Sequence, residues 1–148
     1  MGAIVSNKRL FASNLVQTKG LTQMATVKIK NVQNNLYIAA DSEGKWLYAN
    51  ASQASGLEFE QVDAGSGLLS YRAGAGQTWM TYRNTTGAVK LESQYAWAVE
   101  EVHGGKYVFK QGDGHEFMGI SAGSEELYVV GANNPGSPYC QFVIETIG

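Results

Sequence analysis

Cysteine, proline and long apolar runs are all scarce in this chain. Cys140 is the only cysteine in 148 residues, so no disulfide can form within the chain, which favours a reducing compartment. Two prolines stand against eighteen glycines, a balance typical of a turn-rich globular protein rather than a disordered one. No apolar run approaches the roughly 20 residues that a membrane-spanning helix needs. The length suits one domain with a substantial core.

Charge is also sparse, and it is unevenly distributed. Charged residues make up 16% of the chain, and residues 1–40 contain five basic residues but no acidic one. Residues 41–148 contain six basic and thirteen acidic residues, a net charge of −7. Because phosphate contacts need clustered Lys and Arg, this balance argues against a nucleic-acid partner.

Residues 1–24 are predicted to be an N-terminal extension that precedes the domain. Gly2 behind the initiator methionine, with Ser6 and then Lys8 and Arg9, matches the pattern for N-myristoylation. A membrane is therefore a predicted partner only if Gly2 is acylated. Two alternatives stay open: a plain extension that covers an opening in the core, and a cleaved organelle transit segment. No secretory signal is recognisable, and we predict a cytoplasmic protein.

A six-residue pattern occurs three times, at residues 57–62, 97–102 and 142–147. Each copy has apolar side chains at its first, third and sixth places and Glu at its fourth, and successive copies start 40 and 45 residues apart. Such a period indicates repeated supersecondary units, and apolar residues two apart share one face of a strand. We therefore predict one closing strand per repeat, with its third residue in a common core. These third residues are Phe59, Val99 and Ile144.

Three further strands are predicted in each repeat ahead of the closing one. A basic residue ends the first strand, an aromatic residue seven positions later begins the second, and links rich in Asp, Asn, Ser and Gly lead to the third. The basic and aromatic pairs are Lys30 and Tyr37, Arg72 and Trp79, and Lys110 and Phe117. The sequence thus predicts an all-β domain over residues 25–148, with twelve strands in repeats of about 25–65, 66–105 and 106–148.

Three four-stranded repeats of about 40 residues resemble the β-trefoil superfamily. The resemblance implies a six-stranded barrel of first and fourth strands, capped at one end by three hairpins. The ricin-type signature Gln-x-Trp occurs once, at residues 77–79, but there it opens a second strand instead of lying near a closing one. The segment 103–108, His-Gly-Gly-Lys-Tyr-Val, is more similar to the fascin and hisactophilin branch, although this chain has only two histidines.

No combination of residues predicts catalysis, a metal site or a cofactor. Nucleophilic catalysis needs a Ser or Cys with a base in reach, and Cys140 is predicted to be a buried small apolar residue. His103 and His115 lie far apart with no cysteine partner, which excludes a zinc spacing.

Aromatic and polar residues of the predicted hairpins favour sugar binding instead. Aromatic faces pack against sugar C–H groups, and amides and carboxylates bond the hydroxyls. The segment 131–139, which holds both prolines, is predicted to be an exposed binding loop. The candidate ligand-binding residues are Asp41, Trp46, Tyr48, Asn50, Tyr82, Asn84, His115, Glu116, Asn133, Asn134 and Tyr139.

The function predicted from these features is a non-enzymatic, lectin-like protein whose partner is a glycan or glycoconjugate. Two alternatives stay open. An actin-binding or membrane-associated protein of the hisactophilin type would suit Gly2, and a protease inhibitor would use the loop at 131–139. Because the hairpin residues differ between repeats, we expect one or two binding sites rather than three equal ones.

Overall fold

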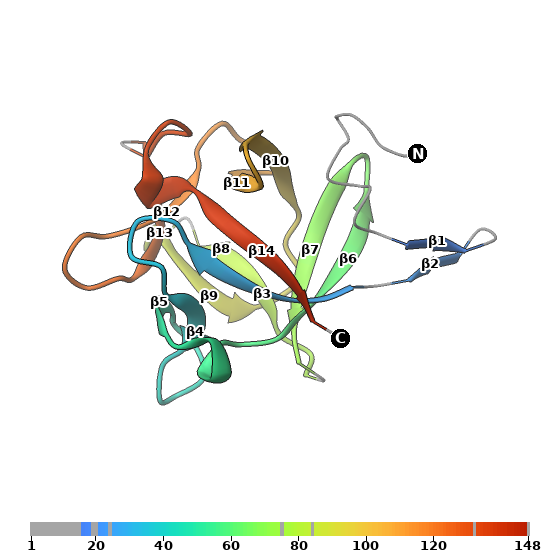
Figure 1. Ribbon diagram of the computed structural model, residues 1–148, viewed down its shortest axis with the longest axis horizontal. Coiled ribbons are helices and arrows are strands. Elements are labelled where there is room, and N and C mark those ends of the chain that lie inside the picture. The colour runs from blue at the N-terminus through green and yellow to red at the C-terminus, as the bar shows by residue number, and fades with distance from the viewer. Residues whose placement is uncertain are drawn as a thin grey trace.

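The protein is a closed barrel capped by hairpins (Figure 1). The computed structural model describes residues 16–18, 21–23, 25–74, 76–83, 85–131 and 133–147. Its regular structure in these ranges is β-strand apart from two 3-10 turns, at Gln53–Ser55 and Pro138–Cys140.

Six strands form the barrel, and each pairs antiparallel with the next until the ring closes. The order is β3–β6–β7–β10–β11–β14 and back to β3. Closure leaves no free edge, and free edges are sites of aggregation. The strands are β3 (Ala25–Asn31), β6 (Phe59–Gly65), β7 (Leu68–Ala73), β10 (Trp97–His103), β11 (Lys106–Gln111) and β14 (Phe142–Ile147).

Three antiparallel hairpins cover one end of the barrel (Figure 1). They join β4 (Tyr37–Ala40) to β5 (Leu47–Ala51), β8 (Trp79–Arg83) to β9 (Ala88–Glu92), and β12 (Met118–Ile120) to β13 (Leu127–Val129). With the barrel they make twelve strands, which confirms the predicted all-β architecture of three four-stranded repeats.

The hairpins hold one another through a threefold set of backbone hydrogen bonds. The N–H of Leu91 donates to the carbonyl of Lys45, that of Val129 to Gly87, and that of Ala49 to Glu125, at 2.8, 2.9 and 2.8 Å. Each bond links the third strand of one repeat to the turn of another. The cap is therefore one connected layer.

A cluster of buried aromatic rings fills the barrel. The ring of Phe109 meets the rings of Tyr71, Trp97 and Phe142 edge to face, with centroids 5.5, 6.2 and 5.5 Å apart. Phe59 adds an edge contact to Tyr71. All five side chains are fully buried. Burial of each such side chain stabilises the fold by about 1.5–3 kcal/mol, and each edge contact adds about 0.5–1.5 kcal/mol.

The predicted alignment of the first closing strand is wrong by two residues. Phe59, Trp97 and Phe142 each lie opposite the last residue of the first strand beside them, and all three are buried. Leu57, which was aligned with Trp97, is half-buried and precedes β6. Because side chains alternate along a strand, a shift of two residues keeps every side chain on the same face. The alternation therefore fits either Leu57 or Phe59 at the position of Trp97, and only strand pairing decides between them.

The corrected alignment puts a glutamine in the core. Gln61, not Phe59, corresponds to Val99 and Ile144, which are half-buried and pack against the core. The Tyr71 hydroxyl donates to Gln61 Oε1 at 2.9 Å, whereas Gln61 Nε2 is buried and has no partner among the described residues. An unpartnered buried amide costs about 1–3 kcal/mol, so repeat one carries a defect that the other two lack.

Part of the N-terminal extension forms a small hairpin of β1 (Val16–Thr18) and β2 (Leu21–Gln23). Among the described strands the two pair only with each other, and the hairpin projects away from the barrel in Figure 1. Gly2, the predicted lipidation site, lies outside the described residues. Over those residues, no helix has the length and apolarity to cross a membrane.

Candidate functional site

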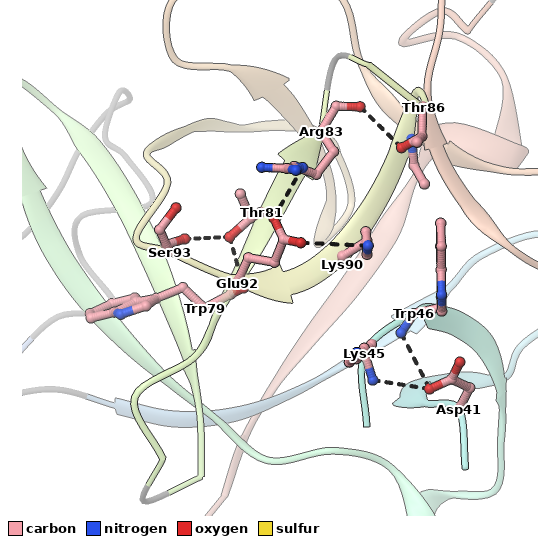
Figure 2. A network of polar contacts seen from close by, with 11 residues as sticks. Asp41, Lys45, Trp46, Trp79, Thr81, Arg83, Thr86, Lys90, Glu92 and Ser93 are labelled. Carbon is pink, nitrogen blue, oxygen red and sulfur yellow. Dashed lines mark hydrogen bonds and ion pairs between the residues drawn. The ribbon is translucent and has the colours of Figure 1, made fainter. Parts of the chain in front are cut away.

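Aromatic and charged side chains gather at several places outside the core, and two of these places include residues predicted to bind a ligand. The first is the cap network, defined by Trp46, Arg83, Lys90 and Glu92, where the hairpins of repeats one and two meet (Figure 2). Lys90 Nζ lies 4.1 Å from the centroid of the Trp46 ring and 3.5 Å from Glu92 Oε2. Arg83 Nε lies 3.1 Å from the other oxygen, Glu92 Oε1. Every charge in the cap network therefore has a partner of opposite sign or an aromatic face.

Asp41 likewise accepts hydrogen bonds from residues of its own turn, as Figure 2 shows. Its Oδ1 accepts hydrogen bonds from the backbone N–H groups of Lys45 and Trp46, at 3.0 and 3.3 Å. The bond from Lys45, which favours the ionised form, is the main cause of a lowered Asp41 pKa. The β4–β5 turn thus holds Trp46 in place under Lys90.

Two further tyrosines of the cap lie beside Glu126. Tyr48 of β5 lies opposite Glu126, and the Tyr128 hydroxyl donates to Glu126 Oε1 at 2.8 Å. That hydrogen bond is the main cause of the raised pKa of Tyr128. Asn50 is exposed at the far end of β5.

The second place is the 2–3 junction, defined by Tyr82, Tyr95, Asp113 and Glu116, where repeats two and three meet. The rings of Tyr82 and Tyr95 meet edge to face with centroids 6.3 Å apart. Tyr95 also packs edge to face on the buried Trp97 at 4.9 Å, and its carbonyl accepts a hydrogen bond from Ser70 Oγ at 2.7 Å. Both tyrosines are half-buried, so each is packed against its neighbours and still partly accessible to solvent.

A compact turn after β11 presents the two carboxylates of the 2–3 junction. The N–H of Gln111 donates to the carbonyl of Glu116 at 2.9 Å, and the N–H of Glu116 donates to Gln111 Oε1 at 3.2 Å. A Cβ on Gly114 would lie 2.2 Å from Gln111 Oε1, so any larger residue there would have to displace the Gln111 amide from this hydrogen bond. Glu116 Oε2 approaches Gly131 in the same way, 3.0 Å from where a Cβ would be.

The charges of the 2–3 junction are not neutralised by the described residues. Asp113 Oδ1 is 3.5 Å from the Tyr95 hydroxyl, a weak contact, and no described side chain forms an ion pair with Asp113 or Glu116. Burial raises the pKa of Tyr82, and Glu116 and then Asp113 raise it further. Burial and then Asp113 raise the pKa of Tyr95 still more. The junction thus combines two neutral phenols with two free carboxylates.

The other two junctions carry different chemistry at equivalent positions. Three backbone hydrogen bonds establish the equivalence, because the N–H groups of Gln111, Ala73 and Asn31 donate to the carbonyls of Glu116, Thr78 and Leu36, each at 2.9 Å. Together with the strand alignment, these bonds identify the residues that correspond to Tyr82, Tyr95 and Glu116. Where repeats one and two meet, they are Ala40, Leu57 and Thr78, in that order. Where repeats three and one meet, they are Ile120, Cys140 and Leu36. The other two junctions form the same backbone hydrogen bond with small or aliphatic side chains at these positions. Packing alone therefore does not require the two tyrosines and Glu116 at the 2–3 junction.

Two of the predicted site residues, Tyr82 and Glu116, therefore belong to the 2–3 junction, and a third, His115, directly precedes Glu116 in the chain. His115 is exposed in the turn between the two carboxylates. Tyr95 and Asp113 were missed, because their role depends on segments from two repeats. An alignment of the three repeats in the correct register would have identified both residues. In that alignment Tyr95 corresponds to apolar residues and Asp113 to Gln33, so both differ in character from their counterparts.

Within the predicted binding loop, the described residues 133–139 are held in part by their own polar side chains. Asn133 Nδ2 donates to the carbonyls of Phe117 and Tyr128, at 3.1 and 3.2 Å, and Asn134 Oδ1 accepts from the N–H of Gly136 at 2.9 Å. Tyr139 is exposed, at 37%. Both asparagines thus have structural partners, while Asn84, another predicted site residue, lies outside the described ranges.

The one thiol is inaccessible. Cys140 is 1% exposed, as predicted, and burial raises the pKa of its thiol, which disfavours the nucleophilic thiolate. Within the described part of the chain, no group of three or more His, Cys, Asp or Glu side chains could hold a metal ion.

Comparison with solved structures identifies the architecture. A ricin B-like lectin of Macrolepiota procera, solved in complex with lactose, aligns with TM-score 0.69 at 11% identity, over 81% of this chain and 94% of the lectin. A designed threefold-symmetric protein, ThreeFoil, aligns with TM-score 0.68 at 10% identity, over 82% of this chain and 99% of the design. The fold is a β-trefoil.

The trefoil also occurs within longer proteins. A GlcNAcα1-4Gal-releasing endo-β-galactosidase of Clostridium perfringens aligns with TM-score 0.69 at 11% identity, over 84% of this chain but only 33% of the enzyme. No protein-family model matches this trefoil, and no curated protein matches its sequence. At such low identities the structural matches establish the fold alone.

Proposed function

We propose that this trefoil is a non-catalytic glycan-binding protein and that the 2–3 junction is its binding surface. The observation that carries the proposal is the asymmetry of a threefold scaffold. Two half-exposed tyrosines and two free carboxylates occupy one junction, while the equivalent positions of the other two carry no carboxylate and no aromatic residue among the described ones.

The chemistry of the junction suits a sugar. The partly exposed side chains of Tyr82 and Tyr95 supply aromatic rings that can pack against sugar C–H groups, and their hydroxyls can donate or accept. Asp113 and Glu116 accept hydrogen bonds from sugar hydroxyls, and bonds to a charged acceptor are stronger than neutral ones. The lactose complex of the structurally similar Macrolepiota procera lectin gives fold-level support.

Binding without catalysis fits the remaining side chains. Cys140 is buried, and His103 and His115 are exposed without a hydrogen-bonded nucleophile among the described residues. Covalent catalysis requires a nucleophile and a base in contact. We therefore assign no reaction step to the junction.

A glycan array followed by calorimetry on the retained sugars tests the proposal. The double variant Asp113→Asn/Glu116→Gln should weaken binding at least tenfold, because it removes both charged acceptors. Glu43→Gln/Glu58→Gln is the matched control, since it removes two exposed carboxylates away from the junction and should leave affinity unchanged. An array that retains no sugar, or a junction variant that binds like the wild type, would overturn the proposal.

The other interpretations stay predictions. No contact in the described chain specifically favours actin binding, membrane association through Gly2, protease inhibition by residues 131–139 or a cytoplasmic location. Glycan binding is the function for which the described residues offer a candidate surface.

A further inference from the structure

We infer that the 2–3 junction selects glycans that carry a free, protonated amine, such as N-unsubstituted hexosamines, over neutral and acidic glycans. The inference rests on the proposed function and names the ligand class of the same site.

Three cationic side chains of the described chain each contact both an aromatic ring and a carboxylate. In the cap network, the Lys90 ammonium lies 4.1 Å from the Trp46 centroid and 3.5 Å from Glu92 Oε2. Beside β14, the Lys30 ammonium lies 5.7 Å from the Tyr37 centroid and 3.7 Å from Glu145 Oε2. Attraction to the ring quadrupole and to the negative charge both favour a cation in such a place.

A third example uses arginine. The Arg72 guanidinium carbon lies 5.7 Å from the centroid of the Trp79 ring, and the same guanidinium pairs with Glu60. Ring, carboxylate and cation therefore occur together at three places on this trefoil.

At the 2–3 junction the ring and carboxylate are present, but no described residue supplies the cation. Tyr82 and Tyr95 provide the rings, and Asp113 and Glu116 provide two negative charges. The cations of the neighbouring β8–β9 hairpin, Arg83 and Lys90, are bound to Glu92 instead. His115 forms no ion pair with either junction carboxylate. An ammonium group on the ligand would complete the combination that the chain uses elsewhere.

Charge then discriminates between related sugars. N-acetylation removes the positive charge, and the carboxylates would lose water without gaining a counter-charge. Sialylated or sulfated glycans would be repelled by both carboxylates and by the net charge of −7 carried by residues 41–148. Since a hydrogen bond to a charged group is worth about one to two factors of ten in affinity, the preference for the amine should be tenfold or more.

Calorimetry with length-matched oligosaccharides measures the preference directly. The ligands are a glucosamine tetramer, its fully N-acetylated form and a neutral glucose tetramer, each titrated at low and high salt. The wild type should bind the glucosamine tetramer at least tenfold more tightly than the other two, and salt should reduce the difference. Asp113→Asn/Glu116→Gln should abolish the preference, whereas Glu43→Gln/Glu58→Gln should keep it. Circular dichroism confirms that both variants fold.

The outcomes separate this inference from the proposed function. Equal binding of the amine and N-acetyl tetramers would overturn the amine preference and leave glycan binding intact. Equal loss of the preference in the control variant would also overturn it, because overall charge would then be the cause. A simple alkylammonium that binds as tightly as the glucosamine tetramer would overturn glycan binding itself, since the sugar would add nothing.

Discussion

The cap network and the 2–3 junction both contain aromatic and charged side chains, but among the described residues only the charges of the cap network are paired. In the cap network, Glu92 is bonded to Lys90 and Arg83, and Lys90 also contacts the Trp46 ring. At the junction, Asp113 and Glu116 face two tyrosines without a cationic partner from the described chain. Charges that pair with one another within the fold add to its stability, whereas unpaired charges are available to interact with a ligand. The comparison therefore separates residues whose charges are paired within the fold from candidate binding residues, a distinction that residue type alone cannot make.

The largest expected effect comes from removing the support under the junction. Trp97→Ala should destabilise the protein by about 3–5 kcal/mol, because it leaves a cavity and removes the indole N–H bond to the Met80 carbonyl, 3.0 Å away. Urea unfolding measures the loss. Trp79→Ala is the control, because Trp79 is half-buried on the surface of β8, and its loss should cost clearly less. Equal costs would contradict the assigned core.

The next effect tests the cap network against the junction directly. Lys90→Met should destabilise the protein by about 1–2 kcal/mol, since the Lys90 side chain is only 16% exposed and its ammonium contacts both a ring and a carboxylate. The junction variant Asp113→Asn/Glu116→Gln should stay within about 0.5 kcal/mol of the wild type. Thermal unfolding of both variants decides the matter; a reversed order would remove the distinction between the two regions.

A smaller effect concerns the unpartnered amide of the core. Gln61→Met combined with Tyr71→Phe should stabilise the protein by about 1 kcal/mol, because it removes the unpaired Nε2 and the hydroxyl that needs Gln61 as acceptor. Gln61→Met alone should gain less, since the Tyr71 hydroxyl then lacks this acceptor. Denaturant midpoints of the two variants and the wild type test the order. A double variant less stable than the wild type would show that Gln61 has a partner in solution.

The smallest effect is the acid response of the cap turn. The lowered pKa of Asp41 means that its contribution is fully present above the unfolded value of about 3.9 and is lost as pH falls through the lower folded value. Wild-type stability should therefore fall more steeply below about pH 4 than that of Asp41→Asn, which keeps an acceptor but cannot be protonated in this range. Urea midpoints from pH 2 to 7 measure how the stability of each protein depends on pH. Parallel slopes would show that ionisation of Asp41 does not contribute to stability.

Most of the architecture was predictable from sequence, because strand periodicity and turn chemistry are local. The basic and aromatic pairs located the first and second strands, and in the structure Lys30, Arg72 and Lys110 lie opposite Tyr37, Trp79 and Phe117. The closing strand of repeat one was misaligned, since Leu57 and Phe59 are both apolar and share a face. Only the partner strand distinguishes them.

The candidate site was less predictable. Trp46 and Asn133 looked like ligand-binding residues, but Lys90 contacts the Trp46 ring and two backbone carbonyls bind the Asn133 amide. Tyr95 and Asp113 looked unremarkable in sequence and meet at the 2–3 junction. Whether a polar side chain is satisfied depends on neighbours from other repeats, which no local pattern contains.

By itself, the sequence determined that three four-stranded units would close around an aromatic core, because apolar periodicity and glycine-rich turns act over a few residues. Tertiary structure alone decided which charges found partners. Ion pairs and ring contacts form between segments tens of residues apart, and their strength depends on distances and exposure that exist only after the barrel has closed.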